Sequence, residues 1–194
     1  MGKFTGALVL LLMLTMFNVA QSQLQLGVKA GINVANVDYK NSESKNVIRF
    51  NTGLVSQIDF NSTFFLRPEL IYSVKGWGFD DGSMNLHYLN MPVLLGFKPT
   101  TKLSVLLGPE LGYLLRTVRK PESPNFDSPY EKIDYGISIG ASYNVAKNTV
   151  IEVRYTYGFD TLLKVFTRDA NNNPTGKDRD GANRVLQFNV IYFF

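Results

Sequence analysis

The chain of 194 residues is long enough for one domain and short for two. It carries a formal net charge of +4 and has no cysteine, which excludes a fold held together by disulfides. After residue 22, no apolar run approaches the roughly 20 residues of a transmembrane helix, so the chain could cross a membrane only as strands.

The first segment has the features of a secretory signal peptide. Lys3 precedes the short apolar core Ala7–Leu14, and small residues lie just before the chain becomes polar. The apolar run is shorter than a membrane anchor needs. We therefore expect residues 1–22 to be a cleaved signal peptide and residues 23–194 to be the mature domain. A cut after Ala20 competes with the cut after Ser22.

Eight later segments alternate apolar and polar residues with a period of two, which is typical of β-strands. The clearest alternation is in the sixth segment, and the eighth ends the chain on an aromatic residue. The predicted strands, in chain order, are Gln23–Val34, Ile48–Phe60, Phe64–Lys75, Leu86–Lys98, Lys102–Arg116, Lys132–Val145, Thr149–Phe159 and Val185–Phe194.

The connections between these strands alternate in length. Those after the second, fourth and sixth strands have three or four residues, whereas the other four form the predicted loops Ala35–Val47, Gly76–Asn85, Thr117–Glu131 and Asp160–Arg184. Short periplasmic turns and long extracellular loops are typical of outer-membrane barrels, which have an even number of strands. The sequence therefore predicts an all-β fold: an eight-stranded antiparallel up-and-down transmembrane β-barrel with both termini on the periplasmic side.

The polar face of the strands is expected to line the barrel interior. Glycines fall on this face, where a narrow barrel is crowded and its strands bend: Gly27, Gly31, Gly53, Gly96, Gly108, Gly112, Gly136, Gly140 and Gly158. Its charged residues are of both signs and could neutralise each other, whereas a lipocalin-like barrel would have an apolar interior. The expected ionic network consists of Arg67, Glu69, Glu110, Asp134, Glu152 and Arg154.

Aromatic residues on the outward face gather near the strand ends, as expected at two membrane interfaces. The predicted loop-side belt contains Tyr72, Trp77, Tyr113, Tyr135, Tyr157 and Phe159. The predicted turn-side belt contains Phe60, Phe64, Phe97, Tyr143, Tyr192 and Phe194.

Several segments resemble the PorT-like outer-membrane β-barrel family, often labelled a porin family: Leu26–Asn33, Arg67–Ser73, Tyr88–Leu95, Leu107–Tyr113, Asp134–Gly136 and Glu152–Tyr155. The resemblance covers nearly the whole mature chain and implies a barrel in the bacterial outer membrane. Some members of that family are tied to protein secretion, which implies a secretion-system protein as an alternative partner.

The sequence gives little support for a channel, an enzyme or a metal site. Side chains nearly fill an eight-stranded barrel, which favours a plugged interior over a small-solute porin. The single histidine, His87, lies near Ser83, Asp80 and Asp81, but no motif fixes a catalytic geometry, and we expect no lipid-modifying activity. Asp178–Gly181 is only a fragment of a calcium loop, so we expect a turn there and no cofactor.

Basic residues near the last two long loops could contact lipopolysaccharide phosphates, although a solvated loop is the alternative interpretation. These residues are Arg116, Arg119, Lys120, Arg168, Lys177, Arg179 and Arg184. The last strand resembles the C-terminal signal by which barrels are handed to their assembly machinery, through Phe188, Val190, Tyr192 and Phe194.

The predicted role is therefore structural or interaction-based, through the extracellular loops. A component of a secretion machinery is the alternative. The expected partners are outer-membrane lipid, lipopolysaccharide and the barrel assembly machinery, and no nucleic acid.

Overall fold

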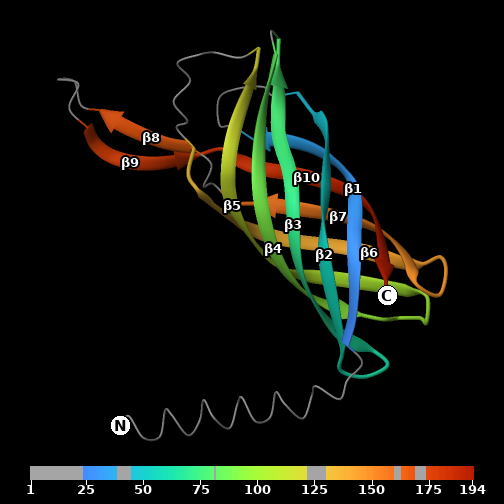
Figure 1. Cartoon of the computed structure of the whole chain (residues 1–194). Coiled ribbons are helices and arrows are strands. Elements are labelled where there is room, and N and C mark those ends of the chain that lie inside the picture. The colour runs from blue at the N-terminus through green and yellow to red at the C-terminus, as the bar shows by residue number, and fades with distance from the viewer. Residues whose placement is uncertain (1–23, 39–44, 81, 122–129, 160–162, 169–173) are drawn as a thin grey trace, which may run out of the picture.

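A closed antiparallel barrel dominates the computed structural model, which describes residues 24–38, 45–80, 82–121, 130–159, 163–168 and 174–194 (Figure 1). The predicted eight-stranded all-β barrel is confirmed. Its strands are β1 (Leu24–Asp38), β2 (Val47–Asp59), β3 (Phe64–Phe79), β4 (Gly82–Phe97), β5 (Leu103–Lys120), β6 (Ile133–Asn144), β7 (Thr149–Gly158) and β10 (Ala182–Phe193). The predicted signal peptide, residues 1–22, lies outside the described residues.

The first and last strands close the barrel. β1 and β10 pair from Gly27–Phe193 to Asp38–Ala182, and the amide of Phe194 donates a hydrogen bond to the carbonyl of Leu26 at 2.8 Å. Closure satisfies the backbone of both strands, so neither is left as an open edge. Among the described residues, no helix is long and apolar enough to cross a membrane.

The outer surface of the barrel is an apolar band bounded by aromatic side chains. Outward side chains such as Leu54, Leu107 and Ile139 are at least half exposed. Along β5 the band runs from Leu103 to Tyr113, which is ten steps along the strand. At about 3.3 Å per residue and a tilt of about 40°, this gives a height of about 25 Å, which matches the apolar band of outer-membrane barrels.

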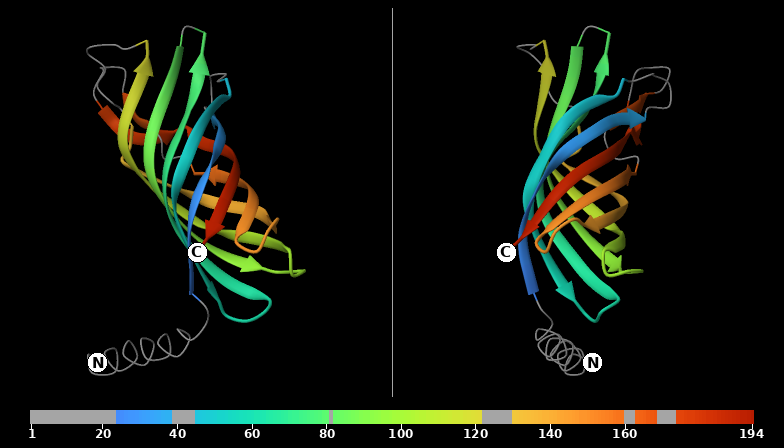
Figure 2. Two further views of the ribbon diagram at one scale, coloured as in Figure 1. Left: turned by 45° about the vertical axis from the view of Figure 1, so that its right-hand side comes forward. Right: turned by 90° about the vertical axis from the view of Figure 1, so that its right-hand side faces the viewer.

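Three strands rise beyond this band at the loop side, as Figure 2 shows for β3, β4 and β5. The predicted loop Gly76–Asn85 is therefore wrong, because β3 and β4 stay paired as far as Phe79 and Gly82. The predicted loop Thr117–Glu131 likewise begins too early, since β5 runs to Lys120.

Local irregularities explain why the sequence pattern did not predict these strand ends. Gly76 has a φ of +138°, in the region that favours glycine. The β4–β5 register also shifts between His87 and Tyr88. Both features interrupt the regular alternation.

Two other predicted loops also contain strand residues. β1 continues to Asp38, inside the predicted loop Ala35–Val47. The predicted loop Asp160–Arg184 contains β8 (Leu163–Arg168) and β9 (Pro174–Asp180), which form a separate two-stranded sheet, as well as the start of β10. Asp178 and Asp180 thus lie in a strand rather than in the expected turn.

The barrel interior has an apolar layer at each end. Near the short turns, one cluster contains Val55, Val150, Ile191 and Phe193, and a second contains Phe65, Leu94 and Leu106. Near the long loops, the buried cluster contains Val37, Trp77, Met84, Leu86, Tyr88, Leu114 and Tyr130. The assignment of Trp77 to the outward belt is therefore wrong: its side chain is 9% exposed and packs edge-on against Tyr130. Trp77 has the inward parity of Ser73 and Lys75 on β3.

Candidate functional site

The centre of the barrel is crossed by ion pairs between strands on opposite walls. β3 and β7 are separated by three strands in either direction around the barrel. Nη1 and Nη2 of Arg154 on β7 donate to the two carboxylate oxygens of Glu69 on β3, at 2.8 and 2.6 Å. Both residues are almost completely buried. This bidentate pair therefore spans the full width of the lumen.

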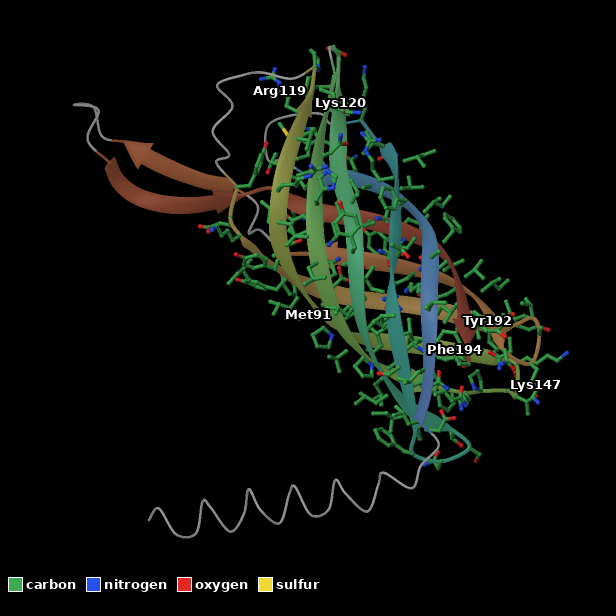
Figure 3. The ribbon with its side chains drawn as sticks, in the orientation of Figure 1. Met91, Arg119, Lys120, Lys147, Tyr192 and Phe194 are labelled. Atoms are coloured by element: carbon green, nitrogen blue, oxygen red, sulfur yellow. The ribbon has the colours of Figure 1, made fainter. Side chains whose placement is uncertain are left out.

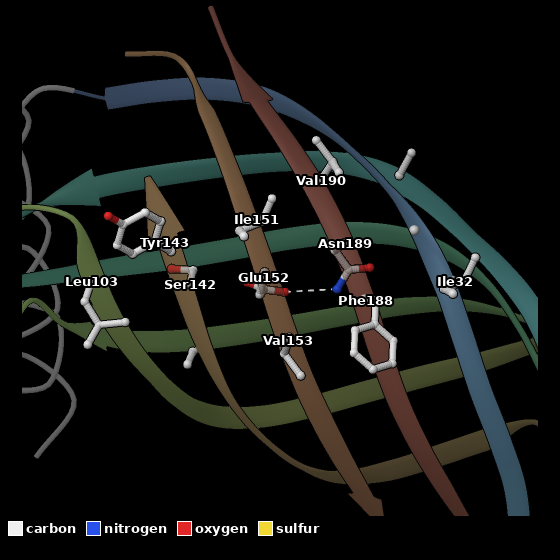
Figure 4. Close-up of a pocket in the computed structure, with 13 residues that line it drawn as sticks. Ile32, Leu103, Ser142, Tyr143, Ile151, Glu152, Val153, Phe188, Asn189 and Val190 are labelled. Atoms are coloured by element: carbon white, nitrogen blue, oxygen red, sulfur yellow. Dashed lines mark hydrogen bonds between the residues drawn. The ribbon is translucent and has the colours of Figure 1, made fainter. Parts of the chain in front are cut away.

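Glu152 on β7 is the second anion of this central cluster. Its carboxylate lies 2.8 Å from Nζ of Lys29 and 3.1 Å from Nη1 of Arg67, and it also accepts hydrogen bonds from Arg154 and Asn189. Figure 4 shows the bond to Asn189 as a dashed line between neighbouring strands β7 and β10. Lys29 joins both walls, because its Nζ also lies 3.1 Å from Glu69.

A second charged cluster lies on the loop side of the first. Nζ of Lys75 is 3.1 Å from Glu110 and 3.6 Å from Asp134. Glu110 also accepts hydrogen bonds from Asn90, Ser138 and Thr156. The interactions of these two carboxylates therefore connect β3, β4, β5, β6 and β7 across the interior.

The two clusters compensate each other in charge. The central cluster has three cations and two anions, and the second has one cation and two anions, so the eight groups sum to zero. The structure brings together all six residues of the expected network. Sequence reasoning missed Lys29 and Lys75, although both lie on the polar face of their strands. Charge balance within that face was the signal that could have identified them.

The outer face of the β3–β5 extension has a hollow of about 470 Å³, which we call the basic groove. It is lined by Arg49, Phe50, Val74, Asn85, His87, Arg116, Val118 and Lys120. Arg116 and Lys120 pair with His87 and Ser83 across the β4–β5 ladder and so point to the same side of the sheet. Two of the predicted lipopolysaccharide contacts thus share a site with Arg49, which sequence reasoning missed.

The other predicted contacts lie elsewhere. Arg119 pairs with buried Met84 on the inner face, and its guanidinium lies over Phe79. Figure 3 shows Arg119 and Lys120 at the long-loop end of the barrel, far from Lys147. Arg184 lies 3.8 Å over the ring of Tyr157 and pairs with Asp38 at 3.3 Å. The side chains of Arg168, Lys177 and Arg179, on β8 and β9, lie outside the described structure.

The residues near His87 are not assembled into a catalytic group. Nδ1 of His87 shares a hydrogen bond of 2.6 Å with the Tyr72 hydroxyl. Ser83 instead accepts a bond from Arg49, and Asp81 lies outside the described residues. Asp80 pairs with Lys45 in an exposed contact, and this hydrogen bond raises the pKa of Lys45 and lowers that of Asp80. The described residues contain no group of acidic or histidine side chains that could hold a metal ion.

The predicted insertion signal forms part of the lipid-facing wall. Phe188, Val190, Tyr192 and Phe194 are 42%, 52%, 47% and 76% exposed. Figure 4 shows Phe188 and Val190 beside Ile151 and Val153 of β7, around a shallow apolar hollow on the outside of the barrel. Tyr192 and Phe194 lie at the short-turn end and contact each other (Figure 3).

Comparisons with known proteins agree with this architecture. Neisserial surface protein A has a similar fold, with a TM-score of 0.61, 16% identity, and coverage of 87% of this chain and 97% of that one. Ail, the attachment invasion locus protein of Yersinia pestis, has a TM-score of 0.53 and 15% identity, with coverage of 88% and 98%. No curated protein matches the chain. Residues 19–164 match the family described as outer membrane protein beta-barrel domain. The chain therefore belongs to this family of bacterial outer-membrane barrels.

Proposed function

We propose that this protein is a plugged outer-membrane barrel that works through its extracellular end and conducts no solute. The observation that carries the proposal is the pairing of Arg154 with Glu69 across the full width of the lumen. Apolar clusters near both ends of the barrel, on either side of the charged clusters, also support the proposal. The part that differs most from a plain barrel is the β3–β5 extension, which rises about 18 Å above Tyr72 if seven residues keep the same rise and tilt.

The proposed partners are outer-membrane lipid and lipopolysaccharide at the extracellular end. The exposed cations on the β3–β5 extension support this part of the proposal. The barrel assembly machinery is the proposed partner of the last strand, and residues 1–22 are the proposed cleaved signal peptide. We further propose that the protein is not an enzyme.

Membership of a secretion machinery is the second candidate. It is supported by the resemblance of segments such as Leu26–Asn33 and Arg67–Ser73 to the PorT-like family. Photo-crosslinking in cells separates the two candidates if the crosslinker is placed at Lys120 in one strain and at the periplasmic turn residue Lys147 in another. Lipopolysaccharide adducts at Lys120 favour the surface role, whereas a reproducible secretion-system adduct at either site favours the alternative.

Planar-bilayer recording tests the plugged interior itself. Purified protein should insert without step-like currents, and Arg154→Ala should lower stability without opening a conducting path. Regular current steps from the wild-type protein would overturn the proposal.

A further inference from the structure

We propose that the basic groove binds the phosphate groups of a lipid headgroup in the outer leaflet. This inference rests on the proposed role of the extracellular end as the working surface. It adds a site, a ligand chemistry and a geometry to that role.

The cations of the groove are not compensated by carboxylates. Other cations near the ends of the barrel pair with acids, for example Lys45 with Asp80 and Lys98 with Asp59. Arg49, Arg116 and Lys120 have no carboxylate partner in the part of the chain that the structure describes. Within the described residues, their positive charges are therefore not neutralised.

Neutral acceptors hold the Arg49 side chain in place. Its Nε donates to Oδ1 of Asn85 at 2.5 Å, Nη1 donates to the carbonyl of Ile48 at 2.7 Å, and Nη2 donates to Oγ of Ser83 at 3.2 Å. These bonds orient the guanidinium but leave its charge intact. A preorganised guanidinium suits phosphate recognition, because less side-chain entropy is lost on binding.

Glycines leave part of the groove without side chains. The ladder between β2 and β3 ends at Asn51–Ser73 and resumes only at the bridge between Lys45 and Gly78. On β3, Gly76 and Gly78 lie opposite Asn85 and Ser83, the two side chains that hold Arg49. A Cβ atom at Gly76 would overlap the carbonyl oxygen of Met84. Glycine at this position therefore allows the backbones of β3 and β4 to approach closely beside the groove.

The height of the groove matches a lipid headgroup. Val74 is the next outward position on β3 after Tyr72, which is in the aromatic belt, and it lines the groove. From Val74 to Gly78, four residues rise about 10 Å at the strand tilt of such barrels. Aromatic belts mark the interface, and anionic headgroups lie immediately above the hydrocarbon. The groove opens outward at that level, facing neighbouring lipids.

Lipid A binding to the full-length mature barrel tests the assignment. Native mass spectrometry would compare lipid A with its dephosphorylated form, on the wild-type protein and on Arg116→Gln/Lys120→Gln. Each cation near an anionic headgroup contributes about fivefold to affinity, so the double variant should lose about 30-fold. The matched control Lys102→Gln/Lys147→Gln removes two exposed charges at the other end of the barrel and should change affinity less than about twofold.

A second variant, Val118→Glu, adds a carboxylate to the groove without removing a contact and should also weaken binding. Heat-modifiable gel mobility would show that each variant folds. Equal binding of dephosphorylated lipid A, or equal losses in the two double variants, would overturn the proposal. Complete displacement of lipid A by millimolar inorganic phosphate would assign the groove to a soluble anion and also overturn it. These outcomes differ from step-like bilayer currents, which would overturn the plugged role whatever the groove binds.

Discussion

Removing Glu152 should destabilise the barrel strongly without opening it. Its buried carboxylate accepts bonds from Lys29, Arg67 and Arg154, and from Asn189. Glu152→Gln keeps the shape of the side chain but leaves three central cations facing Glu69 alone. Breaking a buried pair in this way costs about 3–5 kcal/mol, because a charge stays buried without its partner. The free energy of unfolding should therefore fall by about that amount.

The assay is urea unfolding in phospholipid vesicles, followed by the fluorescence of Trp77, the single tryptophan. Lys29→Met/Glu152→Gln restores the wild-type net charge of the cluster and should be more stable than Glu152→Gln. Asp80→Ala, which breaks an exposed pair, should unfold like the wild type. A loss below about 1 kcal/mol for Glu152→Gln, or additive losses in the double variant, would refute the reasoning.

Three further predictions concern packing, titration and assembly. Gly96→Ala should cost about 1–3 kcal/mol in the same assay, because its Cβ would overlap the buried ring of Phe65, and Phe65→Leu should restore part of the loss. Burial raises the pKa of Tyr130 to about 12. From pH 10 to 12 the unfolded chain loses this proton while the folded chain keeps it, so stability should fall with rising pH, and Tyr130→Phe should lessen the fall. Deleting Tyr192–Phe194 removes the last pairs with β1 and should lower the outer-membrane yield more than synthesis or export; a normal yield would contradict this expectation.

The barrel could be predicted from the sequence because lipid and a polar interior impose a strict period of two. In β6, for example, exposed Ile137 and Ile139 flank buried Ser138. The same rule failed for Gly76–Asn85, where the strands rise above the apolar band. There no hydrocarbon selects apolar residues on the outer face, and Gly76 and the β4–β5 irregularity disturb the alternation.

The sequence could predict which residues belong to the interior network, but not which of them pair with each other. Parity alone placed Arg154 and Glu69 inside, whereas their bidentate contact depends on the stagger between strands 85 residues apart. Arg49 could not be placed in this way, because β2 pairs with β3 only from Asn51 onward, and the Arg49 side chain before this point reaches Asn85. Its role in the basic groove follows from three-dimensional geometry.

The most direct test of a filled, water-excluding interior is the reactivity of a single cysteine. The chain has none of its own, and Ser142 faces the central cluster opposite Glu152 with a hydroxyl that makes no hydrogen bond among the described atoms. Folded Ser142→Cys should resist a charged, membrane-impermeant thiol reagent and react only after unfolding, whereas Lys147→Cys in the exposed turn should react at once. Rapid labelling of folded Ser142→Cys would show a water-filled lumen and contradict the plugged barrel.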